Sequence, residues 1–171
     1  MSYYLKGKNV YLSGPIHGVA DDGKGWREMV SPILSADYGL NVVDPCKKSI
    51  AGEIGEDKKR FKNLIKEKNF KELKNEFYKI VRADLKMTDQ SDFLIVYYSP
   101  SVHMFGTIHE MVVASNQKKP ILVKYDKEQL DNINPWIFCL IKDNWAFDSW
   151  NDMFSYLNKI NSGELDSSHW W

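Results

Sequence analysis

Short apolar runs alternate along the chain with longer segments whose apolar residues recur at helical spacing. The runs are almost continuously apolar, which is typical of strands buried on both faces of a parallel sheet. We predict strands at residues 9–13, 40–43, 93–98 and 121–125. The intervening segments space their apolar residues three and four apart, as helices do. We predict helices around residues 26–34, 73–85, 106–118 and 150–157.

The sequence permits more than one structure for some segments. Residues 137–141 fit either a short strand or a helix, and Pro32 permits a kink or an early end in the first helix. Residues 56–76 are rich in Lys and Glu, which indicates a solvated helical face or a lid. The last helix is expected to begin at Asp148 or Ser149, both good N-caps.

The alternation of strands and helices predicts the fold class and the place of a ligand. We expect an α/β three-layer sandwich with a mainly parallel, Rossmann- or flavodoxin-like sheet of about five strands. Ligands of such sheets bind beyond the carboxyl ends of the strands. The loops that follow Ser13 and Tyr98 are therefore the first places to search for a site.

Composition and charge narrow the classes of partner. The 171 residues fit one domain, which we place at 1–166, followed by a short tail at 167–171. The 23 basic and 23 acidic residues give zero net charge, which argues against a nucleic-acid polymer or an anionic membrane surface as partner. Trp170 and Trp171 end a tail that is loose by default; docking of these rings on this or another subunit is the alternative hypothesis.

Cysteine content and the N-terminal residues indicate a compartment. Cys46 and Cys139 provide neither a disulfide framework nor a zinc site. Residues 1–6 contain no apolar stretch of the kind found in a secretory signal, and the longest apolar run is too short to span a membrane. We expect a reduced, cytoplasmic protein.

The first candidate site is the loop after the first strand, residues 11–18. Its glycines would allow backbone N–H groups to approach a small anion or a sugar closely. The sequence lacks both the dinucleotide fingerprint and the P-loop, and a plain tight turn is the simpler interpretation. The candidate ligand contacts in this loop are Ser13, Gly14, Ile16, His17 and Gly18.

The second candidate is Glu110, shortly after the strongest strand. Thr107 and Glu110 have the spacing of a capping box, and the pattern alone favours that structural role. A glutamate in the first turn of such a helix would also lie near the ligand edge of the sheet, where N–H groups favour its ionised, nucleophilic form. His109 could face either the site or solvent.

The third candidate is Asp84, which lies beside the apolar stripe of its helix. A rim carboxylate paired with Arg82 or a lysine is the common alternative for an isolated aspartate. Two carboxylates in different environments are, however, what glycosidic cleavage requires. Asp84 and Glu110 are candidates for such a pair.

Several motifs occur here in a recognisable order. They are the loop at 11–18, Asp84-Leu85, the Asp92–Val96 strand start, Gly106–Ala114 with Glu110 inside it, and Lys119-Pro120-Ile121. Together they resemble the nucleoside 2-deoxyribosyltransferase family, which includes the 2'-deoxynucleoside 5'-phosphate N-hydrolases. The likeness extends to about Tyr125.

The resemblance implies an enzyme that cleaves the N-glycosidic bond of a nucleoside or nucleotide without metal or cofactor. Glu110 matches the family nucleophile, which attacks C1' and forms a covalent glycosyl-enzyme. Asp84 matches the acidic residue that assists proton transfer, and Tyr11 matches the aromatic near the sugar. Water as acceptor gives hydrolysis, and a second base gives exchange. A nucleotide-sensing module that no longer catalyses turnover is the alternative from another class.

The chain also departs from the transferases. Their loop before the nucleophile contains a second acidic residue, whereas residues 99–105 here contain none. A serine in this loop is more similar to the monophosphate hydrolases, so Ser101 and His17 are the candidate contacts of a 5'-phosphate, beside Gly106. The transferases complete their site with a residue from a neighbouring subunit, for which Asn144 is the candidate here. A homodimer or larger homo-oligomer is therefore expected.

Overall fold

The computed structural model describes residues 4–47 and 59–170 and contains one five-stranded parallel sheet. The strand order is β2-β1-β3-β4-β5, and all paired strands run in the same direction. Its strands are β1 (Asn9–Ser13), β2 (Asn41–Val43), β3 (Phe93–Tyr98), β4 (Ile121–Tyr125) and β5 (Ala146–Phe147). The prediction of an α/β sandwich with a parallel sheet of about five strands is confirmed.

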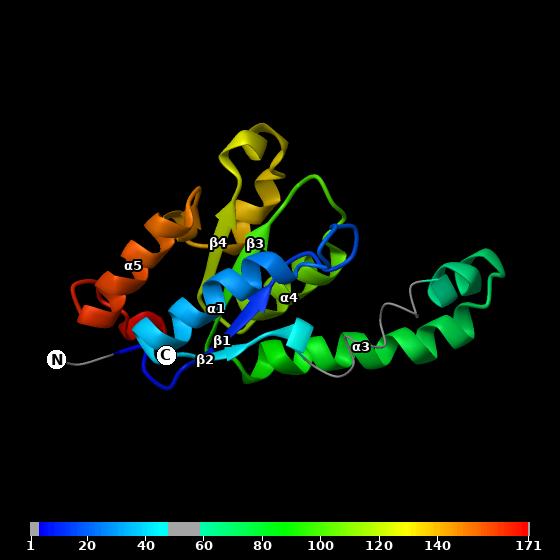
Figure 1. The fold of residues 1–171 in the computed structure, drawn as a ribbon, viewed down its shortest axis with the longest axis horizontal. Coiled ribbons are helices and arrows are strands. Elements are labelled where there is room, and N and C mark those ends of the chain that lie inside the picture. Colours follow the sequence, from blue (N-terminus) through cyan, green and yellow to red (C-terminus); the bar gives the residue numbers. More distant parts are fainter. Residues whose placement is uncertain (1–3, 48–58, 171) are drawn as a thin grey trace.

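Helices cover both faces of the sheet (Figure 1). They are α1 (Lys24–Tyr38), α3 (Phe70–Gln90), α4 (Phe105–Asn116) and α5 (Trp150–Ser162). Short 3₁₀ helices occupy Pro45–Lys47, Lys127–Asn132, Pro135–Leu140, Asp143–Trp145 and Ser168–Trp170. No helix in the described part of the chain is long and apolar enough to cross a membrane.

Alternate residues of the strands divide the core into two halves. Val10 and Leu12 pack with α1 and α5 on one face, whereas Tyr11 packs on the other face with Leu94, Val96 and residues of α3 and α4. This alternation follows from the twofold periodicity of a strand. It places the Tyr11 side chain on the face where α4 begins.

Several local expectations are refined. α1 runs through Pro32 without ending there, and α5 begins after its N-cap Ser149, whose hydroxyl accepts a hydrogen bond from the Asp152 N–H. Residues 137–141 lie in and just after a 3₁₀ helix rather than a strand. The two-residue strand β5 was not predicted, because a pair of apolar residues has no detectable periodicity.

The described part of the charged segment forms a helical hairpin. Residues 59–66 are helical and lie against α3, which extends beyond the sheet (Figure 1). Arg60 forms ion pairs of 2.7 Å with Glu72 and 2.6 Å with Glu76. The Phe61 and Phe77 rings meet edge to face at 5.2 Å. The solvated-helix interpretation fits residues 59–66 and 70–76, while 56–58 lie outside the described residues.

The end of the chain packs against the domain. The Trp170 side chain is 4% exposed and contacts the rings of Phe93, Trp145 and Tyr156. The expectation of a loose tail is therefore wrong for Trp170, because burial of a large indole is more favourable than exposure to water. Trp171 lies outside the described residues.

Candidate active site

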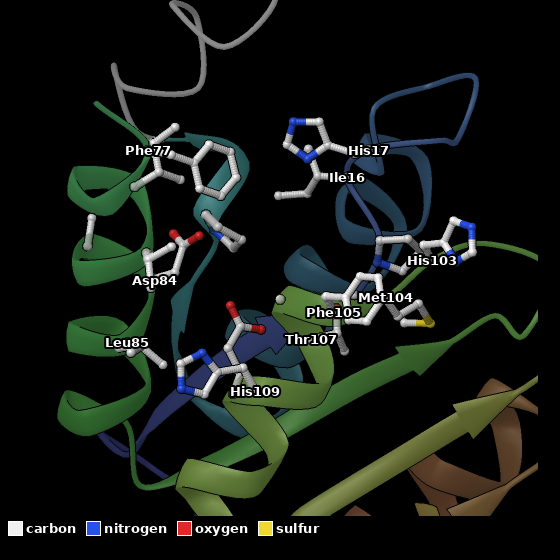
Figure 2. A pocket seen from close by; sticks show the side chains of 18 of the residues that line it. Ile16, His17, Phe77, Asp84, Leu85, His103, Met104, Phe105, Thr107 and His109 are labelled. Carbon is white, nitrogen blue, oxygen red and sulfur yellow. The ribbon is translucent and has the colours of Figure 1, made fainter. Parts of the chain in front are cut away.

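A cavity of about 470 Å³ lies at the carboxyl ends of β1 and β3. Its walls come from the loop after β1, the loop before α4, the first turns of α4 and the middle of α3 (Figure 2). The chain leaves β1 toward α1 on one face of the sheet and leaves β3 toward α4 on the other face. The cavity therefore lies at the topological switch point, where such sheets bind ligands. Its volume lies within the range of small-molecule binding sites.

Glu110 lies in the floor of this cavity and is 6% exposed. The Tyr11 hydroxyl donates a 2.9 Å hydrogen bond to Oε1, and the Ser13 hydroxyl donates one to Oε2. Both carboxylate oxygens therefore have a donor from β1. The two bonds fix the orientation of the carboxylate.

The environment of Glu110 shifts its proton affinity. Burial raises its pKa to about 7, against the opposing effect of the hydrogen bonds from Ser13 and Tyr11. The negative charge of Asp84 raises this pKa further, and the charge of Arg27 lowers it. Burial and then the charge of Glu110 raise the pKa of Tyr11 well above its usual value, so its hydroxyl stays protonated and donates. Glu110 is thus a desolvated carboxylate that exchanges its proton near neutral pH.

The expected capping box does not form. α4 begins at Phe105, its N-cap is Met104, and no side chain caps it, which places Thr107 and Glu110 inside the helix. Glu110 is bound instead by Tyr11 and Ser13, 99 and 97 residues away. The capping prediction was wrong because the two residues before Thr107 already adopt helical geometry.

Asp84 projects from α3 into the cavity on the side opposite the loop after β1 (Figure 2). It is half-buried, and its charge acts on both Tyr11 and Glu110. Arg82, the partner considered for it, has its guanidinium 3.5 Å from the Tyr78 hydroxyl. Tyr11, Asp84 and Glu110 therefore line one cavity, in which Glu110 is buried and Asp84 half-buried.

The other predicted contacts divide into two groups. Gly14, Ile16, His17 and Gly106 line the cavity. Ser13 meets the site through its bond to Glu110 rather than by lining the cavity. The remaining candidates, Gly18, Ser101 and Asn144, are exposed and do not line it.

Two of the outlying candidates have other neighbours. The Ser101 hydroxyl is 3.0 Å from that of Ser99. Asn144 lies beside β5, at the edge of the sheet opposite β2. A contact between Asn144 and a cavity would therefore involve the cavity of another copy.

The structure adds residues that the sequence reasoning missed. His103 and Phe105 line the cavity from the loop before α4 and its first residue, with their rings stacked at 6.0 Å, and Phe77 lines it from α3 (Figure 2). His109 lines the cavity while remaining exposed, which answers the question left open for it. Phe77 was visible as part of the apolar stripe of α3, but nothing local indicated that the stripe continues into a ligand cavity.

Within the described residues, no group of three or more His, Cys, Asp or Glu side chains is arranged to hold a metal ion. The cavity lining in that part of the chain contains three histidines and no lysine or arginine. Its polar groups are thus two carboxylates, one phenol, three imidazoles, one threonine hydroxyl and backbone amides, set among apolar side chains.

Comparison with known proteins supports the fold alone. No family model and no curated protein matches this chain. Among solved structures, the crystal structure of a conserved protein from Enterococcus faecalis V583 is 16% identical, with a TM-score of 0.57, and the match covers 90% of this chain and 99% of that one. The fold and site define an α/β domain with a carboxylate-floored cavity at the switch point of its parallel sheet.

Proposed function

We propose that the protein cleaves the N-glycosidic bond of a nucleoside or nucleoside 5'-monophosphate, with Glu110 as nucleophile. The supporting observation is the Glu110 carboxylate itself, buried in the cavity floor and hydrogen-bonded at both oxygens by Tyr11 and Ser13. An oxocarbenium-like transition state places positive charge on C1', and a desolvated carboxylate beneath it stabilises that charge.

The reaction has two steps in this proposal. Glu110 attacks C1' as the C1'–N bond breaks, and the departing base takes a proton from solvent through a water molecule that the Asp84 carboxylate orders. Water then attacks C1' of the glycosyl ester and returns a proton to solvent by the same route, and the free sugar and the Glu110 carboxylate are released. Formation of the ester removes the charge of Glu110 from a buried site, which favours attack by a carboxylate whose pKa burial has raised.

One experiment identifies both the acceptor of the sugar and the group at its 5' position. Purified protein is incubated with ribo- and deoxynucleosides and their 5'-monophosphates, with and without a second base, and free base is followed by chromatography. Release of base from a monophosphate without acceptor supports hydrolysis. Product nucleoside that forms only with a second base supports exchange. Binding without any cleavage would support a nucleotide-sensing module instead.

A variant pair assigns the nucleophile. Glu110→Gln should abolish turnover while the protein still folds, and Glu128→Gln, at an exposed position on a 3₁₀ helix, should leave it unchanged. Acid quenching during turnover, followed by mass spectrometry, should detect the mass of one sugar on the wild-type chain and none on Glu110→Gln. Equal turnover of the Glu110→Gln variant and the wild type would rule out Glu110 as nucleophile.

We further propose that the protein acts as a homo-oligomer in which Asn144 of one copy completes the cavity of a neighbour. The position of Asn144 at the far edge of the sheet, away from its own cavity, is consistent with this arrangement. Mixing Asn144→Ala with Glu110→Gln subunits should then restore part of the activity that each variant lacks alone. A monomer in light scattering at assay concentration would contradict the proposal.

A further inference from the structure

Arg27 lies beneath the loop that forms one wall of the candidate active site, and its side chain is completely buried. The guanidinium Nε and Nη2 donate 3.2 Å hydrogen bonds to the Leu12 carbonyl, and Nη2 also donates to the Gly14 carbonyl at 3.0 Å. Nη1 donates a 2.7 Å bond to the Gly23 carbonyl. One side chain thus joins the carboxyl end of β1 to the start of α1.

The charge of Arg27 has a buried partner. Asp44, at the end of β2, is 3.6 Å from Nε, and both side chains are almost fully inaccessible to solvent. The Asp44 carboxylate also accepts a 2.9 Å bond from the Cys46 N–H. Removing one member of such a pair leaves a buried charge uncompensated, which is strongly destabilising, so the ion pair must be considered in any test.

The backbone around Arg27 is built to admit the guanidinium. Gly23 has φ +73°, and a Cβ placed there would lie 2.2 Å from the Pro15 carbonyl oxygen and 2.6 Å from Nη1 of Arg27. Only glycine fits between the guanidinium and the loop after β1. The close approach of the Arg27 guanidinium to the loop after β1 therefore depends on glycine at position 23.

This bonding pattern surrounds Ser13, whose hydroxyl binds Glu110. The carbonyls of the residues on either side of Ser13, Leu12 and Gly14, are both held by the same guanidinium. We propose that Arg27 is a positioning residue of the Glu110 site, which fixes the carboxyl end of β1 so that the Ser13 hydroxyl meets the Glu110 carboxylate. Its effect on turnover rests on the proposed glycosidase function, whereas its effect on Glu110 does not.

The electrostatics agree with this role. The positive charge of Arg27 lowers the pKa of both Glu110 and Tyr11, although burial raises each by more. Arg27 therefore has two separable effects: its planar fork orders the backbone, and its charge favours the ionised carboxylate. Lysine retains the charge but cannot bridge two carbonyls in the same rigid geometry.

Three variants separate these effects. Arg27→Lys keeps a cation opposite Asp44. The double variant, Arg27→Met with Asp44→Asn, removes both buried charges together. Arg82→Met is the matched control at an exposed arginine outside the cavity lining. Each is first compared with the wild type by circular dichroism. The pKa of Glu110 is then measured from ¹³C-carboxyl chemical shifts, assigned with the Glu110→Gln spectrum.

We expect the Glu110 pKa to rise in both Arg27 variants, because each loosens the Ser13 hydrogen bond that lowers it. It should rise further in the double variant, which also removes the positive charge, and stay at the wild-type value in Arg82→Met. Cleavage at pH 7 should fall about tenfold or more in both Arg27 variants, because Ser13 is no longer held in place, and remain unchanged in Arg82→Met. The NMR measurement stands even if the protein cleaves no nucleoside. The proposal would be overturned if the double variant folds and keeps the wild-type Glu110 pKa. It would also be overturned if Arg27→Lys folds and cleaves an identified substrate at the wild-type rate.

Discussion

The Tyr11 hydroxyl donates a 2.9 Å hydrogen bond to Oε1 of Glu110, a residue 99 positions further along the chain. The bond joins the centre of β1 to the first turns of α4 across the floor of the cavity. Both partners are buried, so the loss of either group leaves the other without its partner away from water. The same hydrogen bond therefore affects both the stability of the fold and the pKa of Glu110.

Replacing Tyr11 with phenylalanine should weaken the site in two measurable ways. The lost hydrogen bond should cost about 1–2 kcal/mol in the free energy of unfolding, measured by urea denaturation. The pKa of Glu110 should rise above about 7, because that bond is one of the effects that lower it. Tyr38→Phe is the matched control, since it removes a 3.0 Å bond to the Phe154 carbonyl on the other face of the sheet. Equal Glu110 pKa values in Tyr11→Phe and the wild type would contradict this account.

Much of the fold was predictable because its signals are local. The central strands β1, β3 and β4 are buried on both faces, and continuous apolar runs such as Phe93–Tyr98 mark them directly. The order of strands and helices then restricts the topology to a parallel sheet with crossovers. β5 escaped prediction because two residues held only by pairing with β4 have no pattern of their own.

The site was less accessible to sequence reasoning. Spacing alone placed Glu110 in a capping box, whereas its partners Tyr11 and Ser13 come from a distant strand. Their positions made Asp84 and Glu110 a candidate pair and the family resemblance implied the same two residues, but nothing local showed that they line one cavity. Arg27 was not singled out, because an arginine on an amphipathic helix usually lies at the surface and only the tertiary structure reveals its burial.

The docking of Trp170 predicts a large contribution to stability from the last described residue. Trp170→Ala should lower the free energy of unfolding by about 3–5 kcal/mol, because it leaves a void among Phe93, Trp145 and Tyr156. Trp136→Ala is the control, since that ring is 72% exposed and its loss should change stability by about 0.5 kcal/mol or less. Urea denaturation of both variants measures the difference. Similar values for the two would contradict the packing of Trp170.

The raised pKa of Glu110 predicts how stability depends on pH. In the unfolded chain Glu110 ionises near its ordinary pKa of 4.5, whereas in the fold it keeps its proton up to about pH 7. The folded state therefore binds more protons between these values, and the free energy of unfolding falls as pH rises through this window, then stays constant with respect to this group. The loss is on the order of 3 kcal/mol.

Glu110→Gln removes this proton-binding site and isolates its effect. The free energy of unfolding of the variant, relative to the wild type, should increase by about 3 kcal/mol between about pH 4.5 and pH 8. Glu128→Gln, at an exposed position, should show no such change. The measurement is urea denaturation of the three proteins at several pH values. A difference between the Glu110→Gln variant and the wild type that stays constant over this range would show that Glu110 ionises normally in the fold.

Asp84 provides the corresponding prediction for catalysis. If Glu110 attacks as a carboxylate, kcat/KM for a nucleoside substrate should rise with pH and level off above about 7, where Glu110 has lost its proton. The negative charge of Asp84 raises that pKa, so Asp84→Asn should move the rise to lower pH. At the same time the loss of proton assistance to the base should lower the plateau by about 100-fold or more.

The opposite directions of these two effects make the Asp84 experiment specific. A variant that merely disturbed the cavity would lower the rate without moving the pH profile to more acidic values. Asp89→Asn is the matched control, because Asp89 lies on the same helix, is exposed, and accepts a 2.6 Å bond from Gln117 outside the cavity. Its pH profile and plateau should equal those of the wild type. A shift of the Asp84→Asn profile toward higher pH would mean that Asp84 favours the ionised form of Glu110, and the proposed division of roles between the two carboxylates would then be wrong.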